Sequence, residues 1–435
     1  LIYFPLLIVR YCGIQNLDLY EVNYHYSDIV IHLVKLSSYR ELCEIIGKSD
    51  EVLQRNSAHL NTVLETLDIQ QHSLGVLAVL VAKYSLPQGN NDVDRSGMYQ
   101  QIHDFITNCN GEQVRFSPDL YADLCHLLTD HLVDIKQPIR GIEILKKAIR
   151  KIQLFDSQLT SIHADLCQLC LLSKCMKPAL EFLDTDVTGI GSEAKLGGNS
   201  DSKHFLLYYY YGGMIYTALK NYDRALYFFE VVVTVPAMVV SHIMLEAYKK
   251  YLLISYLLHR KILPMPKYTS QVVYRFLKPL SVAYHEIATT PHATIKNREI
   301  YVRDKNMGLV YQLLNAGYKK SIQRLTKTFI TLSLSDVASR VQLSGPAEAE
   351  SYILNMIEEG EIYAMINQKD GMVVFLDSPE KYASPETLSI LEQQMNVIII
   401  INDCFILFQY VKKSVGSHDE DMPATSQNAK STYTM

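Results

Sequence analysis

The sequence predicts a mainly α-helical protein in which paired helices lead into a small module of helices and a β-ribbon. Three observations carry this prediction. Apolar residues recur at helical spacing from about residue 27 to 285, the segment 207–236 has the pattern of a tetratricopeptide unit, and residues 328–378 have the pattern of two helices and a hairpin. We therefore expect an α-solenoid of TPR-like helical repeats, followed by a winged helix with a small β-sheet.

Composition narrows the classes of function. The chain has 435 residues, enough for two or three domains, and 48% of them are apolar. Its net charge of −5 disfavours binding to nucleic acid and to anionic membranes. Eight cysteines without the spacing of a disulfide framework indicate reduced, intracellular thiols. Residues 1–26 lack an initiator Met, and we expect them to be an atypical segment of a fragment or an incorrect translation.

Helical periodicity in the first half of the chain predicts the solenoid. In "GIEILKKAIRKI" (141–152) the apolar residues fall on one helical stripe. Residues 161–183 have the pattern of a helix, a turn and a second helix opened by proline. The Gly- and Ser-rich segment 188–200 predicts a loop, and we place a domain boundary there, between a repeat region (27–200) and a second domain (201–378).

The segment 207–236, "LYYYYGGMIYTALKNYDRALYFFEVVVTVP", matches a tetratricopeptide unit whose turn is "KNYD". Small residues at Gly213 and Ala225 allow its two helices to approach closely, and Tyr216 and Phe229 fill the space beside them. Because one such unit cannot bury its own apolar face, we expect neighbouring helices to stack on it.

An amphipathic helix precedes the winged helix, which we place at 328–378. Its basic residues gather on one face, which is either an ordinary solvated face or a surface for an acidic partner. These residues are Lys319, Lys320, Arg324 and Lys327.

Local signals define the elements of the winged helix itself. Ser333 and Asp336 form a capping box, Ser344 is the expected N-cap of the second helix, and Gly360 closes that helix in the left-handed conformation. The two strands of the expected hairpin, in "EIYAMINQKDGMVVFL", are joined by the turn "QKDG".

After residue 378 we expect a C-terminal helical segment (379–412) and a disordered polar tail (413–435). The run "VIIIINDCFILF" (397–408) would expose a β-prone apolar stretch with one charge, so we interpret it as a non-native insert that resembles translated intron. Asn402 and Asp403 interrupt the run, which is too short for a membrane span.

No motif of a catalytic or cofactor site stands out. The sequence lacks a phosphate-binding glycine loop, a His-Glu-x-x-His motif, a Gly-x-Ser-x-Gly elbow and a His-x-His pair. The sharpest metal candidate is the set His163, Cys167, Cys170 and Cys175. However, His163 and Cys170 would lie about 10 Å apart along a helix axis, and cysteine also packs as a small apolar residue. We therefore expect no catalytic residue, no cofactor and no metal.

The charge of the second helix in the winged-helix module argues against DNA recognition. "PAEAESYILNMIEE" contains four Glu and no Lys or Arg. A helix that reads DNA lies close to negatively charged phosphates, which these Glu residues would repel. The ribbon instead suits a sheet edge that another chain extends, so that a proline at Val374, if this residue lies on the outer edge, should block assembly. The candidate protein-interaction residues are Leu332, Ile362, Tyr363, Met365, Val373, Val374 and Phe375.

Three segments, "LTSIHADLCQLCLLSKCMKPAL", "YYYYGGMIYTALKNYDRALYF" and "TLSLSDVASRVQLSGPAEAE", resemble the PCI-domain family, and within it the subunit 3 family of the COP9 signalosome. The resemblance implies a non-catalytic scaffold with a PCI domain over 201–378, whose helical part ends at 327. It implies binding to other signalosome subunits through winged-helix edges and C-terminal helices, and indirectly to cullin-RING ligases, from which the complex removes Nedd8. It also implies a place in cytoplasm and nucleus, without DNA or membrane as partners.

Two alternatives stay open at this point. One is a PCI scaffold subunit of the proteasome lid or of a translation initiation factor complex. The other is a nucleic-acid-binding regulator that uses the winged helix and the basic face at 319–327.

Overall fold

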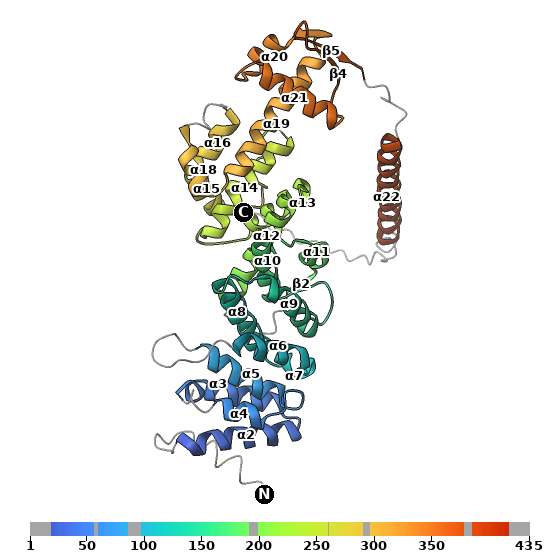
Figure 1. Ribbon diagram of the computed structural model, residues 1–435. Coiled ribbons are helices and arrows are strands. Elements are labelled where there is room, and N and C mark those ends of the chain that lie inside the picture. Colours follow the sequence, from blue (N-terminus) through green and yellow to red (C-terminus); the bar gives the residue numbers. More distant parts are fainter. Residues whose placement is uncertain are drawn as a thin grey trace, which may run out of the picture. The chain divides into compact units, whose positions relative to one another are not determined.

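The computed structural model describes residues 19–55, 60–85, 97–190, 199–259, 261–289, 296–377 and 385–416. They belong to two compact units, Leu1–Leu314 and Asn315–Met435, and the division falls within helix α19 (Met307–Thr326). The first unit consists of successive helices and the second contains the winged helix, so the predicted fold class is confirmed (Figure 1).

Some expectations concern parts of the chain that lie outside the described residues. Most of the atypical segment 1–26 is among them, as are 191–198 of the predicted boundary loop and all but the first four residues of the predicted tail 413–435. The domain boundary at residue 200 stays a prediction.

The first unit stacks each helix on its neighbours along the chain. For example, α9 packs on α10, α10 on α12, α12 on α13, and α13 on α14. One continuous apolar core runs through the unit, and a short parallel pair, β1 (Gln158–Leu159) with β2 (Gly189–Ile190), joins two of its loops. The helices of this unit are α2 (Leu19–Lys35), α3 (Tyr39–Arg55), α4 (Leu60–Thr66), α5 (Ser73–Ser85), α6 (Met98–Asn108), α7 (Gly111–Val114), α8 (Pro118–Asp134), α9 (Ile139–Ile152), α10 (Ile162–Ser173), α11 (Lys177–Leu183), α12 (Asn199–Ala218), α13 (Tyr222–Thr234), α14 (His242–His259), α15 (Gln271–Leu280), α16 (Val282–Thr289) and α18 (Arg298–Arg303).

Local sequence signals place several of these helices correctly. The predicted apolar stripe of α9 is buried at Ile142, Leu145, Ile149 and Ile152. The helix, turn and helix predicted at 161–183 are α10 and α11. A left-handed Lys174 (φ 58°) ends α10, and proline occupies the first turn of α11.

The predicted tetratricopeptide-like pair is formed by α12 and α13. Asn221 caps α13 by accepting a hydrogen bond from the Arg224 N–H. The two helices approach so closely at Gly213 that a Cβ there would lie 2.8 Å from the ring of Phe229, which is fully buried. Tyr216 anchors the pair to the preceding helix, because its hydroxyl donates to Asp184 Oδ1 at 2.6 Å.

The winged helix in the second unit follows the predicted order of elements. After α19 come β3 (Thr331–Ser333), α20 (Leu334–Val341), α21 (Pro346–Glu358), β4 (Tyr363–Asn367) and β5 (Met372–Leu376). Its own apolar core lies between the helices and the inner face of the sheet. The members of this core are Ile322, Leu332, Leu334, Val337, Ala338, Val341, Ala349, Ile353, Met356, Ile362, Val373 and Phe375.

Two of the three predicted helix ends are confirmed and the third is displaced by one residue. Ser333 accepts from the Asp336 N–H at 3.0 Å, and Gly360 has a φ of +70°. The N-cap of α21 is Gly345 rather than Ser344. The reason is that Glu348 reaches back, and the Ser344 N–H and hydroxyl donate to its carboxylate at 2.9 and 2.6 Å.

The last described helix, α22 (Pro385–Gly416), passes without a break through residues 397–408. Every side chain from residue 388 to 409 is exposed. The stretch Thr387–Gln409 is long and apolar enough to cross a membrane by length and composition. This corrects the expectation that the run is too short, which rested on 397–408 alone. A helix that is apolar all round also suits the interior of a helical bundle, and the interpretation of 397–408 as an insert stays a prediction.

We predict opposite effects of adding a methyl group at two helical glycines. Gly213→Ala should lower the free energy of unfolding by about 1–3 kcal/mol, because the buried Phe229 ring cannot move away. Gly47→Ala, on α3 with nothing within 4 Å of its Cβ, should raise it by about 0.5–1 kcal/mol. Urea unfolding of both variants measures the difference. Equal stability of the two would contradict the close approach of α12 and α13.

Candidate protein-interaction surface

The sheet of the winged helix has the strand order β3-β5-β4, so β5 is its central strand. Val374 in β5 pairs with Thr331 on one side and with Met365 on the other. This corrects the supposition that Val374 lies on the outer edge. A proline at Val374 would remove a ladder donor inside the sheet and test the fold rather than the edge.

The direction of the backbone groups on β4 follows from the register. The Phe375 N–H donates to the Ile330 carbonyl at 2.8 Å, so the backbone groups of Phe375 face β3. Because these directions alternate along a strand, Val374 faces β4 and exchanges hydrogen bonds with Met365. The N–H and C=O groups of Ala364 and Ile366 therefore point away from β5, to a side on which no other described strand pairs.

The structure divides the seven predicted interaction residues into two groups. Leu332, Ile362, Val373 and Phe375 are buried in the winged-helix core and hold the sheet on its helices. Tyr363 and Met365 are exposed on the outer face, 41% and 61% respectively, and Val374 is half-buried between the two edge strands.

The sequence reasoning missed one exposed apolar residue of this surface. Leu376 pairs with Tyr363 across the sheet and shares its outer face. Ile330, just before β3, is 78% exposed as well, but it lies opposite Phe375 and so does not belong to the outer face. The alternation of inward and outward residues around the "QKDG" turn could have identified Leu376, because the register places it opposite Tyr363. We call Tyr363, Met365, Val374 and Leu376 the outer sheet face.

The acidic residues near the sheet hold the module together. Glu350 on α21 accepts a hydrogen bond from the Gln368 side chain in the hairpin turn at 2.7 Å. Glu359 and Glu361 both bind Lys319, and the Lys319 Nζ lies 3.3 Å from Glu361 Oε1. Burial opposes the charge of Lys319, but these carboxylates raise its pKa above the ordinary value. Lys319 of the predicted basic face is thus paired within its own unit.

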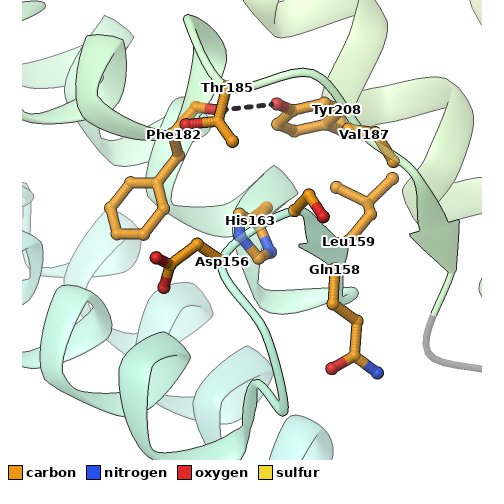
Figure 2. Close-up of a pocket in the computed structure, with 9 residues that line it drawn as sticks. Asp156, Gln158, Leu159, His163, Phe182, Thr185, Val187 and Tyr208 are labelled. Carbon is orange, nitrogen blue, oxygen red and sulfur yellow. Dashed lines mark hydrogen bonds between the residues drawn. The ribbon is translucent and has the colours of Figure 1, made fainter.

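The four residues singled out as a metal candidate lie in the first unit, and one of them, His163, lines a small pocket (Figure 2). Figure 2 shows His163 among Leu159, Phe182 and Tyr208, with the Tyr208 hydroxyl donating to the Phe182 carbonyl. The pocket holds about 10 Å³, room for a single water molecule and too small for a cofactor.

The four candidate ligands do not form a metal site within the described part of the chain. His163, Cys167, Cys170 and Cys175 do not bring three ligand atoms together there. Burial raises the pKa of Cys167 and Cys170, that of Cys170 to about 12, so both remain protonated thiols.

His163 is held as a neutral ring by its neighbours. The Gln153 amide nitrogen donates to the Gln158 carbonyl at 2.8 Å and lies 3.2 Å from His163 Nε2. Since an amide nitrogen is a donor, His163 Nε2 accepts this hydrogen bond. A proton on His163 Nε2 would place an N–H donor opposite the N–H donor of Gln153. Burial lowers the pKa of His163 from 6.5 to about 4.

This lowered pKa predicts a pH dependence of stability. His163 takes up a proton near pH 6.5 in the unfolded chain but only near pH 4 in the folded one. The free energy of unfolding should therefore be intact above pH 6.5 and fall by about 3 kcal/mol as the pH drops to 4. Urea unfolding of wild type and His163→Gln at both pH values isolates this contribution. An identical fall in the two proteins would contradict it.

Comparison with known proteins agrees with this architecture. Residues 36–273 match the family model "COP9 signalosome complex subunit 3, N-terminal helical repeats", and residues 292–377 match the PCI domain. The chain is 47% identical over 436 aligned residues to COP9 signalosome complex subunit 3 of Drosophila melanogaster, covering 93% of this chain and 97% of that protein. It is 40% identical over 365 residues to the protein of the same name from Dictyostelium discoideum, covering 81% and 85% of the two chains.

These matches confirm the resemblance found in the three sequence segments. The repeat match covers more than half of the chain, and both relatives are aligned over most of their length. The chain belongs to the COP9 signalosome subunit 3 family of PCI-domain proteins.

Proposed function

We propose that the chain is a non-catalytic scaffold subunit of the COP9 signalosome, which joins other subunits and so supports the removal of Nedd8 from cullins. The observation that carries this proposal is the open edge of β4. Its outward backbone groups at Ala364 and Ile366 lie beside the exposed side chains of Tyr363 and Met365. Membership of the subunit 3 family supports the choice of complex.

The open edge supplies what an added strand requires. Backbone groups that point outward from a sheet form hydrogen bonds with any strand of suitable register, so they give affinity without selecting a sequence. Selection comes from side chains on the adjoining face. Tyr363, Met365 and Leu376 offer an apolar patch next to the edge, which a partner of the same architecture would cover.

The exposed helix α22 is the second contact of this proposal. Its apolar residues surround the helix axis, so a helix of this kind is stable in water only when other helices cover it. Helices of neighbouring subunits are the covering partners we propose. Regulation of cullin-RING ubiquitin ligases, in cytoplasm and nucleus, follows from the complex as a whole, and its chemistry belongs to another subunit.

The alternatives are less well supported. The subunit 3 match favours the signalosome over the proteasome lid and the initiation factor complex. DNA recognition would require α21 to approach phosphates, yet its described side chains include Glu348, Glu350 and Glu358 and no cation.

We predict that Ala364→Pro weakens assembly while the winged helix stays folded. The substitution removes an outward N–H that makes no hydrogen bond within the sheet, and its ring obstructs an incoming strand. The loss of one hydrogen bond together with this obstruction should weaken incorporation by at least about tenfold. Co-purification with co-expressed signalosome subunits measures the effect.

Two variants provide the controls. Ala364→Ser keeps the N–H at nearly the same volume and should assemble normally. Val374→Pro removes an inner ladder donor and should unfold the winged helix, as followed by circular dichroism. A folded Ala364→Pro chain that enters the complex in full yield would refute pairing at the β4 edge.

We also predict that the purified chain alone leaves a Nedd8–cullin conjugate intact, because its proposed contribution is assembly and the chemistry belongs to another subunit. Gel analysis after prolonged incubation measures this, with the complete signalosome as the positive control. Cleavage by the isolated chain at a rate proportional to its concentration would overturn the non-catalytic role.

A further inference from the structure

Three helices of the first unit bring two histidines and an aspartate together. His126 lies on α8, Asp165 on α10 and His204 on α12, and one ligand atom from each lies within 4.8 Å of the other two. His126 Nδ1 is 2.5 Å from Asp165 Oδ2, and the rings of His126 and His204 stack with centroids 4.2 Å apart. Asp165 is 7% exposed, whereas both histidines are partly open to solvent.

The charges around this cluster favour a cation. Asp123 and Asp130 lie three residues before and four residues after His126, on the same face of α8. Both act on His126 together with Asp165. Lys203, on the helix that carries His204, acts on Asp130 together with His126.

We propose that His126, Asp165 and His204 bind one divalent transition-metal ion, for which Zn²⁺ is the best fit. Two imidazoles and a carboxylate are ligands that zinc accepts, whereas Mg²⁺ and Ca²⁺ prefer oxygen alone. Ligands from facing helices are also the usual way in which helical bundles hold metals. A water molecule completes the four ligands.

Binding requires His126 and Asp165 to move apart and the two imidazole rings to turn. With Zn–N distances of about 2.0–2.1 Å, two ligand atoms of a tetrahedral site lie roughly 3.3 Å apart. His126 and Asp165 must therefore separate by less than about 1 Å, and His126 must lose a proton. The imidazoles must also rotate out of their parallel stack, since one ion must lie in the plane of both rings.

The proposed ion would cross-link α8, α10 and α12 and act as a structural element of the solenoid. This inference is independent of the proposed function, because it involves neither the winged-helix edge nor α22. It also revises the expectation of a chain without metal, and it assigns the ion to residues other than the cysteines.

The test is isothermal titration of the metal-free full-length chain with zinc chloride near neutral pH. We expect one Zn²⁺ per chain, with little binding of Mg²⁺. His126→Gln and His204→Gln should each weaken binding by at least about 100-fold, since even outer-shell changes cost roughly 10- to 100-fold. His103→Gln is the matched control, because His103 also lies beside an aspartate, Asp104, at 3.3 Å, and it should leave binding unchanged.

Cysteine variants and spectroscopy make the assignment specific. Cys170→Ser should retain the ion, and X-ray absorption at the zinc edge of the wild type should show two imidazoles and no sulfur, a readout that depends on no variant. Absence of stoichiometric zinc would overturn the proposal. Sulfur ligands, loss of zinc on Cys170→Ser, or full binding by a folded His126→Gln/His204→Gln variant would overturn it equally.

Discussion

This structure depends on one constraint: each apolar helix face must be covered by a neighbouring element. A two-helix unit such as α12 and α13 leaves one face uncovered, and in the first unit the next helices cover it in turn. This stacking requires close approach, which Gly213 permits against the ring of Phe229. The winged helix also has sides that need a neighbour, because its central strand leaves each outer strand with a side on which no described strand pairs.

Features set by neighbouring residues were predictable from the sequence. The N-cap at Ser333, which is the half of the predicted capping box that the structure shows, and the left-handed Gly360 each depend on a few adjacent residues, so their signals are local. The strand order was not predictable in this way. Whether β5 lies between β3 and β4 depends on pairing between segments some 40 residues apart, with Thr331 opposite Val374, and the hairpin pattern is the same for either order. The His126, Asp165 and His204 cluster was missed for the same reason, since no motif links three helices.

The charges of the second unit explain why a winged helix can serve assembly. Glu350 joins α21 to the hairpin turn, and Glu359 and Glu361 pair with Lys319 on α19, so the acidic residues make contacts within the module. The surface left beside the β4 edge is apolar instead, at Tyr363, Met365 and Leu376. The acidic α21 disfavours phosphates, and under the proposed function the β4 edge accepts a strand. The family match then identifies the signalosome as the complex in which we propose that the strand is supplied.

Amide hydrogen exchange on β4, in the free chain and in the assembled complex, tests the central claim most directly. In the free chain the Met365 N–H is bonded to β5 and should exchange slowly, whereas those of Ala364 and Ile366 point outward and should exchange fast. Assembly should slow Ala364 and Ile366 and leave Met365 as it was. If Ala364 and Ile366 exchange equally fast in the complete complex, the β4 edge is not where this chain joins its partners.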